Sequence, residues 1–332
     1  MSSDSELILA VDGGGTKTVL AFANRDGELV FLDQGASSNP MDNERWREQL
    51  SQLFTAAGHL LPSTVHAVFG LPGFGEIKRF DELMRSAAAD LSSAPHHVMN
   101  DVELALDGAF VGRPGVLLLA GTGSMAMARD AGGQVLRVGG WGEIFGDEGS
   151  AFWIGREALS ATSQALDGRT DAVDFANGIL SGLGLDIGGG CDALMSWCYG
   201  SQRLRSAVAG VARFVDALAR SGNRTALAIL NSAADHLSAH LTAIRRCMKG
   251  AQPATWSYAG GVFESRVIGA MLARRHGKPR PPRLPPIAGG LWRAAREAGW
   301  RTDDAWIEKL AESTRRNIAI LKRLHDENGG AV

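Results

Sequence analysis

Residues 7–30 read LILAVDGGGTKTVLAFANRDGELV. An apolar run at 7–11 ends in an acid, three glycines and Thr-Lys-Thr, and a second apolar run at 19–23 leads to a turn at Asp26-Gly27. This order predicts two antiparallel strands joined by a glycine-rich connection, followed by a second hairpin through the Asp-Gly turn. Because glycines carry no Cβ, backbone N–H groups in the connection can approach an anion closely. The segment therefore predicts a phosphate-binding loop.

The loop combines hydrogen-bond donors with one acid. Asp12, at the end of the first strand, repels a phosphate but can hold a hydrated Mg²⁺ ion that the phosphate also contacts. The Walker A and dinucleotide-binding spacings are both absent, and the residues that follow read as a strand rather than a helix. A tight hairpin whose glycines serve only the backbone is the alternative. We expect a nucleotide with its magnesium ion, the phosphates being held by Gly13, Gly14, Gly15, Thr16, Lys17 and Thr18.

Composition limits the class of protein. The chain has 332 residues, of which 45% are hydrophobic and 21% charged, so it can form two packed domains of a soluble enzyme. A net charge of −2 gives no reason to expect nucleic acid or a membrane surface as partner. The polar start MSSDSE does not read as a signal peptide, and the three cysteines form no CxxC pair. We therefore expect a cytoplasmic protein without a zinc site.

Two polar residues in the first third are candidates for binding a hydroxyl group. Asp101 follows a predicted strand at 97–100 and precedes a predicted helix at 103–110. Since α/β sheets place ligand-binding groups at the carboxyl ends of parallel strands, Asp101 is the candidate general base, with a helix N-cap as its alternative role. Asn39, in the loop 34–40, can donate to and accept from a hydroxyl, although it also suits a turn before Pro40.

The middle of the chain repeats the opening plan. Residues 116–120, 125–129 and 135–138 are predicted strands, and a glycine-threonine loop joins the first two. The repeat predicts duplicated lobes that face a shared cleft, with their boundary near Arg113-Pro114-Gly115. The second loop would hold the nucleotide phosphates from the other side, through Gly121, Thr122, Gly123 and Ser124.

The segment 139–155, GGWGEIFGDEGSAFWIG, is the most specific pattern in the chain. Its acids and glycines precede a long helical stretch, so carboxylates and backbone amides gather at a helix start where neutral hydroxyl groups could bind. Trp141 offers a flat apolar face for a pyranose ring. A helix cap with a core tryptophan is the alternative. Further along we expect helices from 151 to about 248, a strand at 255–259, a proline-rich edge strand at 280–286 and a helix at 304–324.

DGGGTKT at 12–18 resembles the first phosphate loop of the actin-like ATPase superfamily, and the chain resembles its N-acetylglucosamine kinase and BadF/BadG-type ATPase branch. The resemblance implies an α/β fold of two ribonuclease H-like lobes around a central cleft, the second lobe carrying a helical insertion. It implies a first lobe at 1–114, joined by the C-terminal helix 303–326, and a second lobe at 115–302. WGxxxGDEGSAxW resembles the sugar-binding segment of these kinases. By resemblance, the sugar contacts Asn39, Asp101, Gly140, Trp141, Gly142 and Asp147, and an adenosine loop contains Gly260, Gly261 and Ser265.

The resemblance implies an ATP-dependent kinase that phosphorylates an amino sugar, N-acetylglucosamine or glucosamine, at the 6-hydroxyl, with Asp101 as general base and ATP and Mg²⁺ as cofactors. The partner would be the small-molecule sugar, and a homodimer is the assembly we consider. The alternative is an ATPase activator of a reductase or dehydratase system, which needs cysteines for an iron–sulfur cluster. Those activators carry a cysteine directly before an Ala-Gly-Thr-Gly segment, where this chain has Leu119.

Overall fold

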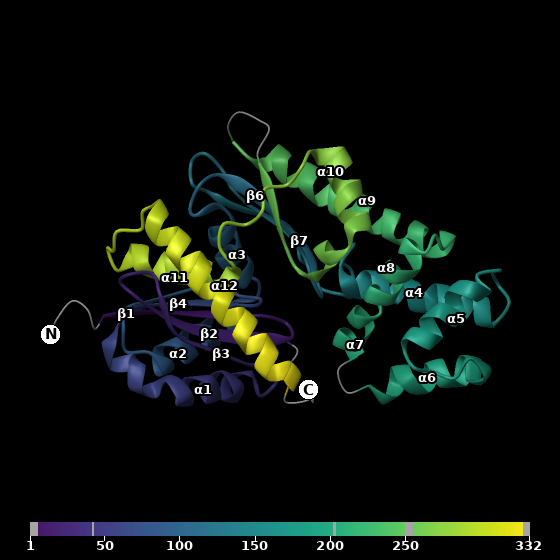
Figure 1. Cartoon of the computed structure of the whole chain (residues 1–332), viewed down its shortest axis with the longest axis horizontal. Coiled ribbons are helices and arrows are strands. Elements are labelled where there is room, and N and C mark those ends of the chain that lie inside the picture. The colour runs from purple at the N-terminus through teal and green to yellow at the C-terminus, as the bar shows by residue number, and fades with distance from the viewer. Residues whose placement is uncertain (1–5, 42, 202–203, 250–254, 328–332) are drawn as a thin grey trace. The chain divides into compact units, whose positions relative to one another are not determined.

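The computed structural model describes residues 6–41, 43–201, 204–249 and 255–327 (Figure 1). The chain divides into two compact units, a first unit of residues 1–113 and 281–332 and a second unit of residues 114–280. This division differs from the expected one, which assigned residues up to 302 to the second lobe. The sequence also predicts a frayed C-terminal tail at 328–330, and these residues lie outside the described part of the chain.

The first unit contains a five-stranded sheet in the order β3-β2-β1-β4-β5. β1 pairs antiparallel with β2, and β2 with β3, so both predicted hairpins are confirmed. β4 and β5 add in parallel on the other side of β1. The strands are β1 (Leu7–Gly13), β2 (Lys17–Asn24), β3 (Leu29–Ala36), β4 (Thr64–Leu71) and β5 (His96–Asn100).

Helices cover both faces of this sheet. Alternate strand residues such as Leu9 and Phe22 pack with the apolar side chains of α1 (Trp46–Ala57) and α2 (Lys78–Leu91). The intervening residues, such as Ile8, face the opposite layer. That layer consists of α3 (Asp101–Phe110), α11 (Pro286–Glu297) and α12 (Asp304–Glu327). The alternation of side chains along each strand therefore supplies two separate cores.

Residues 280–286 do not form the predicted edge strand. They run as an irregular segment into α11, whose first residue is Pro286. A Cβ on Gly289 would lie 2.4 Å from the carbonyl oxygen of Leu104, so α11 packs backbone to backbone against α3. This packing places α11 in the first unit, and the prediction of a strand was wrong because proline, with its fixed φ, also suits the first turn of a helix.

The second unit repeats the sheet with one strand fewer, in the order β8-β7-β6-β9. β6, β7 and β8 form an antiparallel meander and β9 joins β6 in parallel, which confirms the predicted repeat. The strands are β6 (Gly115–Ala120), β7 (Ser124–Arg129), β8 (Val135–Gly139) and β9 (Trp256–Ala259).

The predicted helical stretch between β8 and β9 is also confirmed. Its longest member, α9, contributes a row of buried residues to the core of the second unit, from Ala226 to Ile244. The helices are α4 (Ala151–Leu166), α5 (Val173–Gly182), η3 (Ile187–Gly189), α6 (Gly190–Gly200), α7 (Leu204–Gly210), α8 (Ala212–Arg220) and α9 (Arg224–Cys247), and η4 (Gly261–Glu264) and α10 (Arg266–His276) follow β9. None of the helices in the described part of the chain combines the length and apolar character that crossing a membrane requires.

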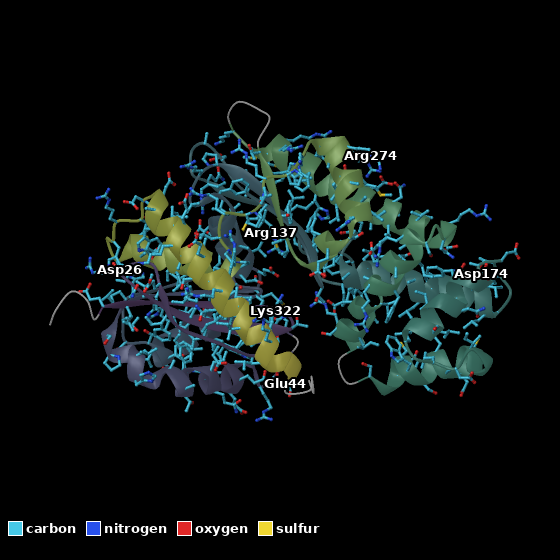
Figure 2. The ribbon with its side chains drawn as sticks, viewed as in Figure 1. Asp26, Glu44, Arg137, Asp174, Arg274 and Lys322 are labelled. Atoms are coloured by element: carbon cyan, nitrogen blue, oxygen red, sulfur yellow. The ribbon has the colours of Figure 1, made fainter. Side chains whose placement is uncertain are left out.

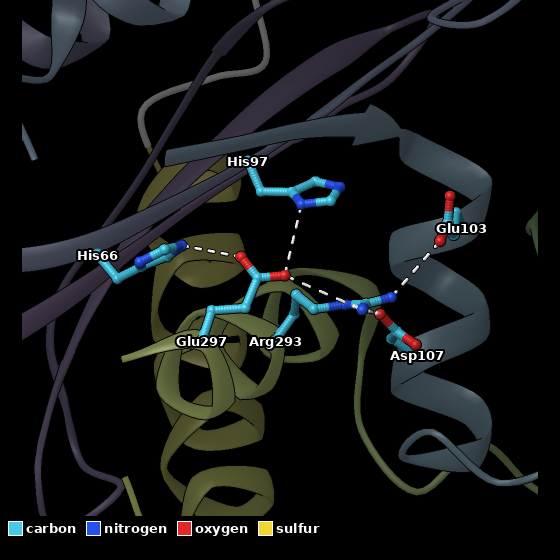
Figure 3. A network of polar contacts seen from close by, with 6 residues as sticks. All are labelled: His66, His97, Glu103, Asp107, Arg293 and Glu297. Carbon is cyan, nitrogen blue, oxygen red and sulfur yellow. Dashed lines mark hydrogen bonds and ion pairs between the residues drawn. The ribbon is translucent and has the colours of Figure 1, made fainter. Parts of the chain in front are cut away.

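Charged side chains lie mostly outside these cores, as the exposed Asp26, Asp174 and Arg274 illustrate (Figure 2). A buried exception joins α3 to α11. The carboxylate of Asp107, which is fully buried, accepts a hydrogen bond of 2.8 Å from Nε of Arg293. Glu297, one turn further along α11, contacts His66 at 2.8 Å and His97 at 3.4 Å (Figure 3). This network fixes α3 against α11 and the first residues of β4 and β5.

Candidate active site

The first glycine-rich loop is a tight hairpin turn between β1 and β2. The N–H of Gly14 donates to the carbonyl of Lys17 at 2.8 Å, and Oγ of Ser37 donates to the carbonyl of Gly14 at 2.9 Å. A Cβ on Gly13 would lie 2.6 Å from Oγ of Ser38, so only glycine fits there. Residues 15–17 are exposed, whereas Thr18 is buried. Its hydroxyl has no hydrogen-bond partner among the described residues. The tip at 15–17 is therefore open to solvent, as a phosphate loop requires.

Asp12 and Asp101 lie at the carboxyl ends of β1 and β5. Burial raises the pKa of Asp12 from 3.8 to about 7, and the nearby Lys17 opposes the rise. The pKa of Asp101 is raised to about 8, first by burial and then by the charges of Asp12 and Glu76, while hydrogen bonds from backbone N–H groups oppose the rise. The two carboxyl groups therefore form one electrostatically coupled pair beside the phosphate loop. A pair of this kind favours either a shared proton or a bound cation.

The helix cap at this point is Asn100 rather than Asp101. Oδ1 of Asn100 accepts from the N–H of Val102 at 3.0 Å, and its amide donates to the carbonyl of Phe74 at 3.0 Å. Asp101 is the first residue of α3. Its carboxyl group is therefore not needed as the cap, which leaves the base role as the remaining prediction.

Glu76 was missed by the sequence reasoning. It follows the loop after β4, in which Gly73 and Gly75 have positive φ angles. Its carboxylate is close enough to Asp101 to raise the pKa of that residue. An acid behind a glycine-rich loop at the same sheet edge was the available signal, because parallel strands end at one edge.

Asn39 is 4% exposed and sits in a turn, where its side-chain oxygen accepts from the N–H of Met41 at 3.0 Å. Its own N–H donates to Oγ of Ser37 at 3.2 Å. The side chain of Ser37 thus bridges this turn and the phosphate loop, since it also bonds Gly14. The turn role is confirmed, and contact with a sugar stays a prediction.

In the second unit, the loop Gly121–Ser124 is bonded along its length to the segment that starts α4. The N–H of Ala151 donates to the carbonyl of Gly121 at 2.8 Å, and Oγ of Ser124 donates to the carbonyl of Glu148 at 2.8 Å. The predicted phosphate loop and the predicted sugar segment of this unit are therefore a single rigid structure.

Asp147 occupies the centre of that structure. It has a φ of +56°, one of two positive values at non-glycine residues in the described chain. One carboxylate oxygen accepts from the N–H of Ser124 at 3.1 Å, and the other accepts from Arg205 on α7 at 2.9 Å. Burial raises the pKa of Asp147, and the bonds from Ser124 and Arg205 oppose the rise. Glu143 contacts the same guanidinium at 3.1 Å.

Other residues of this segment supply the helix cap and the core tryptophan that the alternative interpretation requires. Ser150 caps α4 by accepting from the N–H of Trp153 at 3.1 Å, and Trp153 is the core tryptophan. Trp141 is 68% exposed, with the guanidinium of Arg137 at 5.8 Å from its ring. The neighbouring Gly140 and Gly142 have φ angles of +73° and +83°. Helix capping therefore does not account for the exposed Trp141, and a ligand-binding role for Trp141 and Asp147 stays a prediction.

The predicted adenosine loop follows β9. Gly260 has a φ of +100°, and a Cβ there would lie 2.3 Å from the carbonyl oxygen of Ala120, so the loop passes directly beside Gly121. Gly261 begins η4. Ser265 caps α10, and its hydroxyl donates to Asp216 at 2.5 Å. The geometry brings the two glycine loops of the second unit together, and the hydroxyl of Ser265 is already bonded within the protein.

Within the first unit the structure gathers Asp12, Gly13–Thr18 and Asp101 at one sheet edge. The described residues contain no group of three or more His, Cys, Asp or Glu side chains placed to hold a metal ion. Magnesium does not need such a group, because it keeps several waters and binds through one or two carboxylates together with substrate phosphates. Asp12, beside the exposed loop tip, fits that requirement.

Comparison with known proteins gives consistent matches. An N-acetylmuramic acid/N-acetylglucosamine kinase of Clostridium acetobutylicum is 28% identical over 246 residues, and the match covers 71% of this chain and 78% of that protein. An N-acetyl-D-glucosamine kinase of Dictyostelium discoideum is 26% identical over 211 residues, covering 58% and 65%. A solved structure of a Chromobacterium violaceum protein assigned as an N-acetylglucosamine kinase has a TM-score of 0.70 at 26% identity, covering 87% of this chain and 99% of that one.

The family match covers most of the chain. Residues 9–289 match the model of one ATPase family, and this range includes both sheets and every candidate residue named above. The expected α/β class, with two related sheets and a helical insertion in the second unit, is confirmed by the topology and by the solved neighbour. The chain belongs to the BadF/BadG/BcrA/BcrD ATPase family.

Proposed function

We propose that this protein is an ATP-dependent kinase of an amino sugar, with N-acetylglucosamine or glucosamine as the acceptor and the 6-hydroxyl as the phosphorylated group. The names of its relatives support a sugar kinase acting on this class of substrate. The observation that carries the proposal is the position of Asp101. Its carboxyl group lies at the sheet edge that carries the phosphate loop, and it is not the cap of its helix.

In this reaction Asp101 would accept the proton of the attacking hydroxyl group of the sugar. A general base works best when its pKa lies near the operating pH, and a pKa of about 8 satisfies that condition far better than the usual 3.8 of an aspartate. Burial is the largest cause of the rise in pKa, so the rise depends on the fold. Asn39, in the same unit, would orient the sugar through hydrogen bonds.

A bound Mg²⁺ ion would neutralise phosphate charge during transfer, and Asp12 is the residue that would hold it, through water. Lys17 and the free N–H groups of the loop tip would contact the phosphates. In the second unit we assign phosphate binding to Gly121–Ser124, nucleoside binding to Gly260, Gly261 and Ser265, and sugar binding to residues 140–142 and Asp147. Catalysis of this kind depends mainly on positioning and charge neutralisation.

The test is a coupled assay of ADP release with ATP, Mg²⁺ and a panel of sugars that contains N-acetylglucosamine, glucosamine, N-acetylmuramic acid and glucose. We expect turnover with at least one amino sugar and a product whose phosphorus couples to carbon 6 in nuclear magnetic resonance spectra. ATP hydrolysis that no sugar stimulates would contradict the proposal. A phosphate on another hydroxyl would refute only the assigned position.

A further inference from the structure

The ion pair between Arg205 and Asp147 joins residues that are 58 positions apart in the chain. Arg205 lies on α7, inside the helical insertion, whereas Asp147 belongs to the segment before α4. The side chain of Asp147 is 5% exposed and that of Arg205 is 26% exposed. An exposed ion pair contributes little to the stability of the fold, but a buried carboxylate that loses its cation destabilises it strongly. The contact with Arg205 therefore holds the buried carboxylate of Asp147 in place.

The carboxylate of Asp147 is fixed from two directions. The N–H of Ser124 holds one oxygen and Arg205 holds the other, which leaves each oxygen a further lone pair. The carboxylate also lies directly against the second glycine loop. A Cβ added to Gly123 would lie only 2.8 Å from Oδ1 of Asp147. A carboxylate with this many constraints has one orientation, which is what hydrogen bonding to a particular sugar hydroxyl requires.

Backbone strain gives a second, independent observation. Asp147 has a left-handed φ of +56°, a conformation that costs roughly 1 kcal/mol for a residue with a side chain. Gly146 precedes it and Gly149, with a φ of +80°, follows two residues later, so the turn around Asp147 has glycine on both sides. Glycine and asparagine also enter this region, so the turn alone does not require a carboxylate at position 147.

We propose that Arg205 is a positioning residue for sugar binding, which orients the carboxylate of Asp147 and keeps it charged. This inference rests on the proposed function. Among the described residues, two charged groups face Asp147, namely Arg205 from α7 and Glu143 from the loop after β8, and they act in opposite directions on its protonation. Arg205 lowers the pKa of Asp147 and Glu143 raises it, after burial as the largest cause.

The experiment measures the dissociation constant of N-acetylglucosamine by calorimetry at several pH values, without ATP. In Arg205→Gln we expect about tenfold weaker binding, since a hydrogen bond to a charged group is lost. Sugar binding should be lost at low pH, where Asp147 takes up a proton. In Arg205→Gln we expect this loss to occur about one pH unit higher, because the positive charge near Asp147 is gone. Arg205→Lys should recover part of both effects. Glu143→Gln should move the loss of sugar binding to lower pH, because it removes a negative charge near Asp147. A merely structural role of these residues does not predict this opposite direction.

Three controls separate the explanations. Arg156→Gln removes an exposed arginine of α4 that pairs with its neighbour Glu157, so this variant should bind the sugar as the wild type does. Asp147→Asn and the double variant Asp147→Asn/Arg205→Gln should bind equally weakly if Arg205 acts through Asp147. Circular dichroism checks folding of each variant, and Arg205→Lys carries the test if Arg205→Gln does not fold.

The outcomes distinguish the inference from the function on which it rests. Wild-type protein that neither binds nor phosphorylates any amino sugar refutes the proposed function. Wild-type protein that binds N-acetylglucosamine, with Arg205→Gln binding at the same affinity and with the same pH limit, refutes the role of Arg205 alone. Additive losses in the double variant would also refute it.

Discussion

Replacement of Asp101 by asparagine should make the ligand-free protein more stable and much less active. Asparagine keeps the size of the side chain but carries no charge. In the wild type, the folded protein holds a proton on Asp101 up to about pH 8, whereas the unfolded chain releases it near 3.8. Between these values the folded state binds more protons, so the stability of the wild type falls as the pH rises and the penalty is complete above pH 8.

The size of the effect follows from the same two values. A rise from 3.8 to about 8 corresponds at most to about 6 kcal/mol, at 1.36 kcal/mol per pH unit. Asp101 is only partly buried, and water on its open side screens the charge, so we expect about 2–3 kcal/mol. For a unit of this size that corresponds to a melting temperature roughly 5–10 °C higher.

The assay is thermal unfolding of wild type, Asp101→Asn and the control Asp90→Asn, an exposed aspartate of the same unit, at pH 5 and pH 9. The rise in melting temperature of Asp101→Asn over the wild type should be small at pH 5 and complete at pH 9. The control Asp90→Asn should show no such rise at either pH. Turnover of the variant should fall by about 10²–10⁴-fold, the usual contribution of a general base. A gain that does not grow with pH would refute the electrostatic argument, and near-normal turnover would remove Asp101 from the mechanism.

Three further outcomes are expected. In assays of the wild type, kcat/KM should rise with pH towards a plateau above about 8, the pKa of Asp101, and additional Mg²⁺ should move this rise to lower pH, because a cation near Asp12 favours the charged form of Asp101. Arg293→Met should lower the free energy of unfolding by about 3–5 kcal/mol, measured in urea, because it leaves the buried Asp107 without its cation, and adding Asp107→Asn should restore part of it. Gly123→Ala should raise the KM for the sugar by about tenfold, since the new Cβ displaces the carboxylate of Asp147; an unchanged KM would show that this carboxylate has room to move.

The repeat of strand, glycine loop and strand was predictable because it rests on local patterns. Apolar runs and turn residues at 7–30 and again at 116–138 determine both meanders, and the structure has them within a residue or two. The segment 280–286 was misread for the opposite reason. Its prolines suit an extended strand and a helix start equally well, and only the tight contact of Gly289 with α3 decides between them.

The candidate site was predictable in part. Asp12 and Asp101 were found because each follows a strand, and a strand end is visible in the sequence. The partner of Asp147 was not, because Arg205 lies in a helical region whose folding back onto residues 143–147 depends on tertiary packing. Glu76 was missed for a similar reason, since its effect on Asp101 arises between separate strands.

The second unit interrupts the first, and this has a consequence for synthesis of the chain. Ile8 and Ala10 on β1 are covered by α11 and α12, which the ribosome makes only after residues 114–280. At a synthesis rate of about 5–20 residues per second, this face of the sheet stays uncovered for roughly 10–30 s while residues 114–280 emerge and fold. During that interval α3, which carries Asp101, lacks the helix that holds it. A nascent chain therefore contains the loop 13–18 before α3 is fixed, and Asp101, the proposed base, reaches its place in the fold only when α11 and α12 pack.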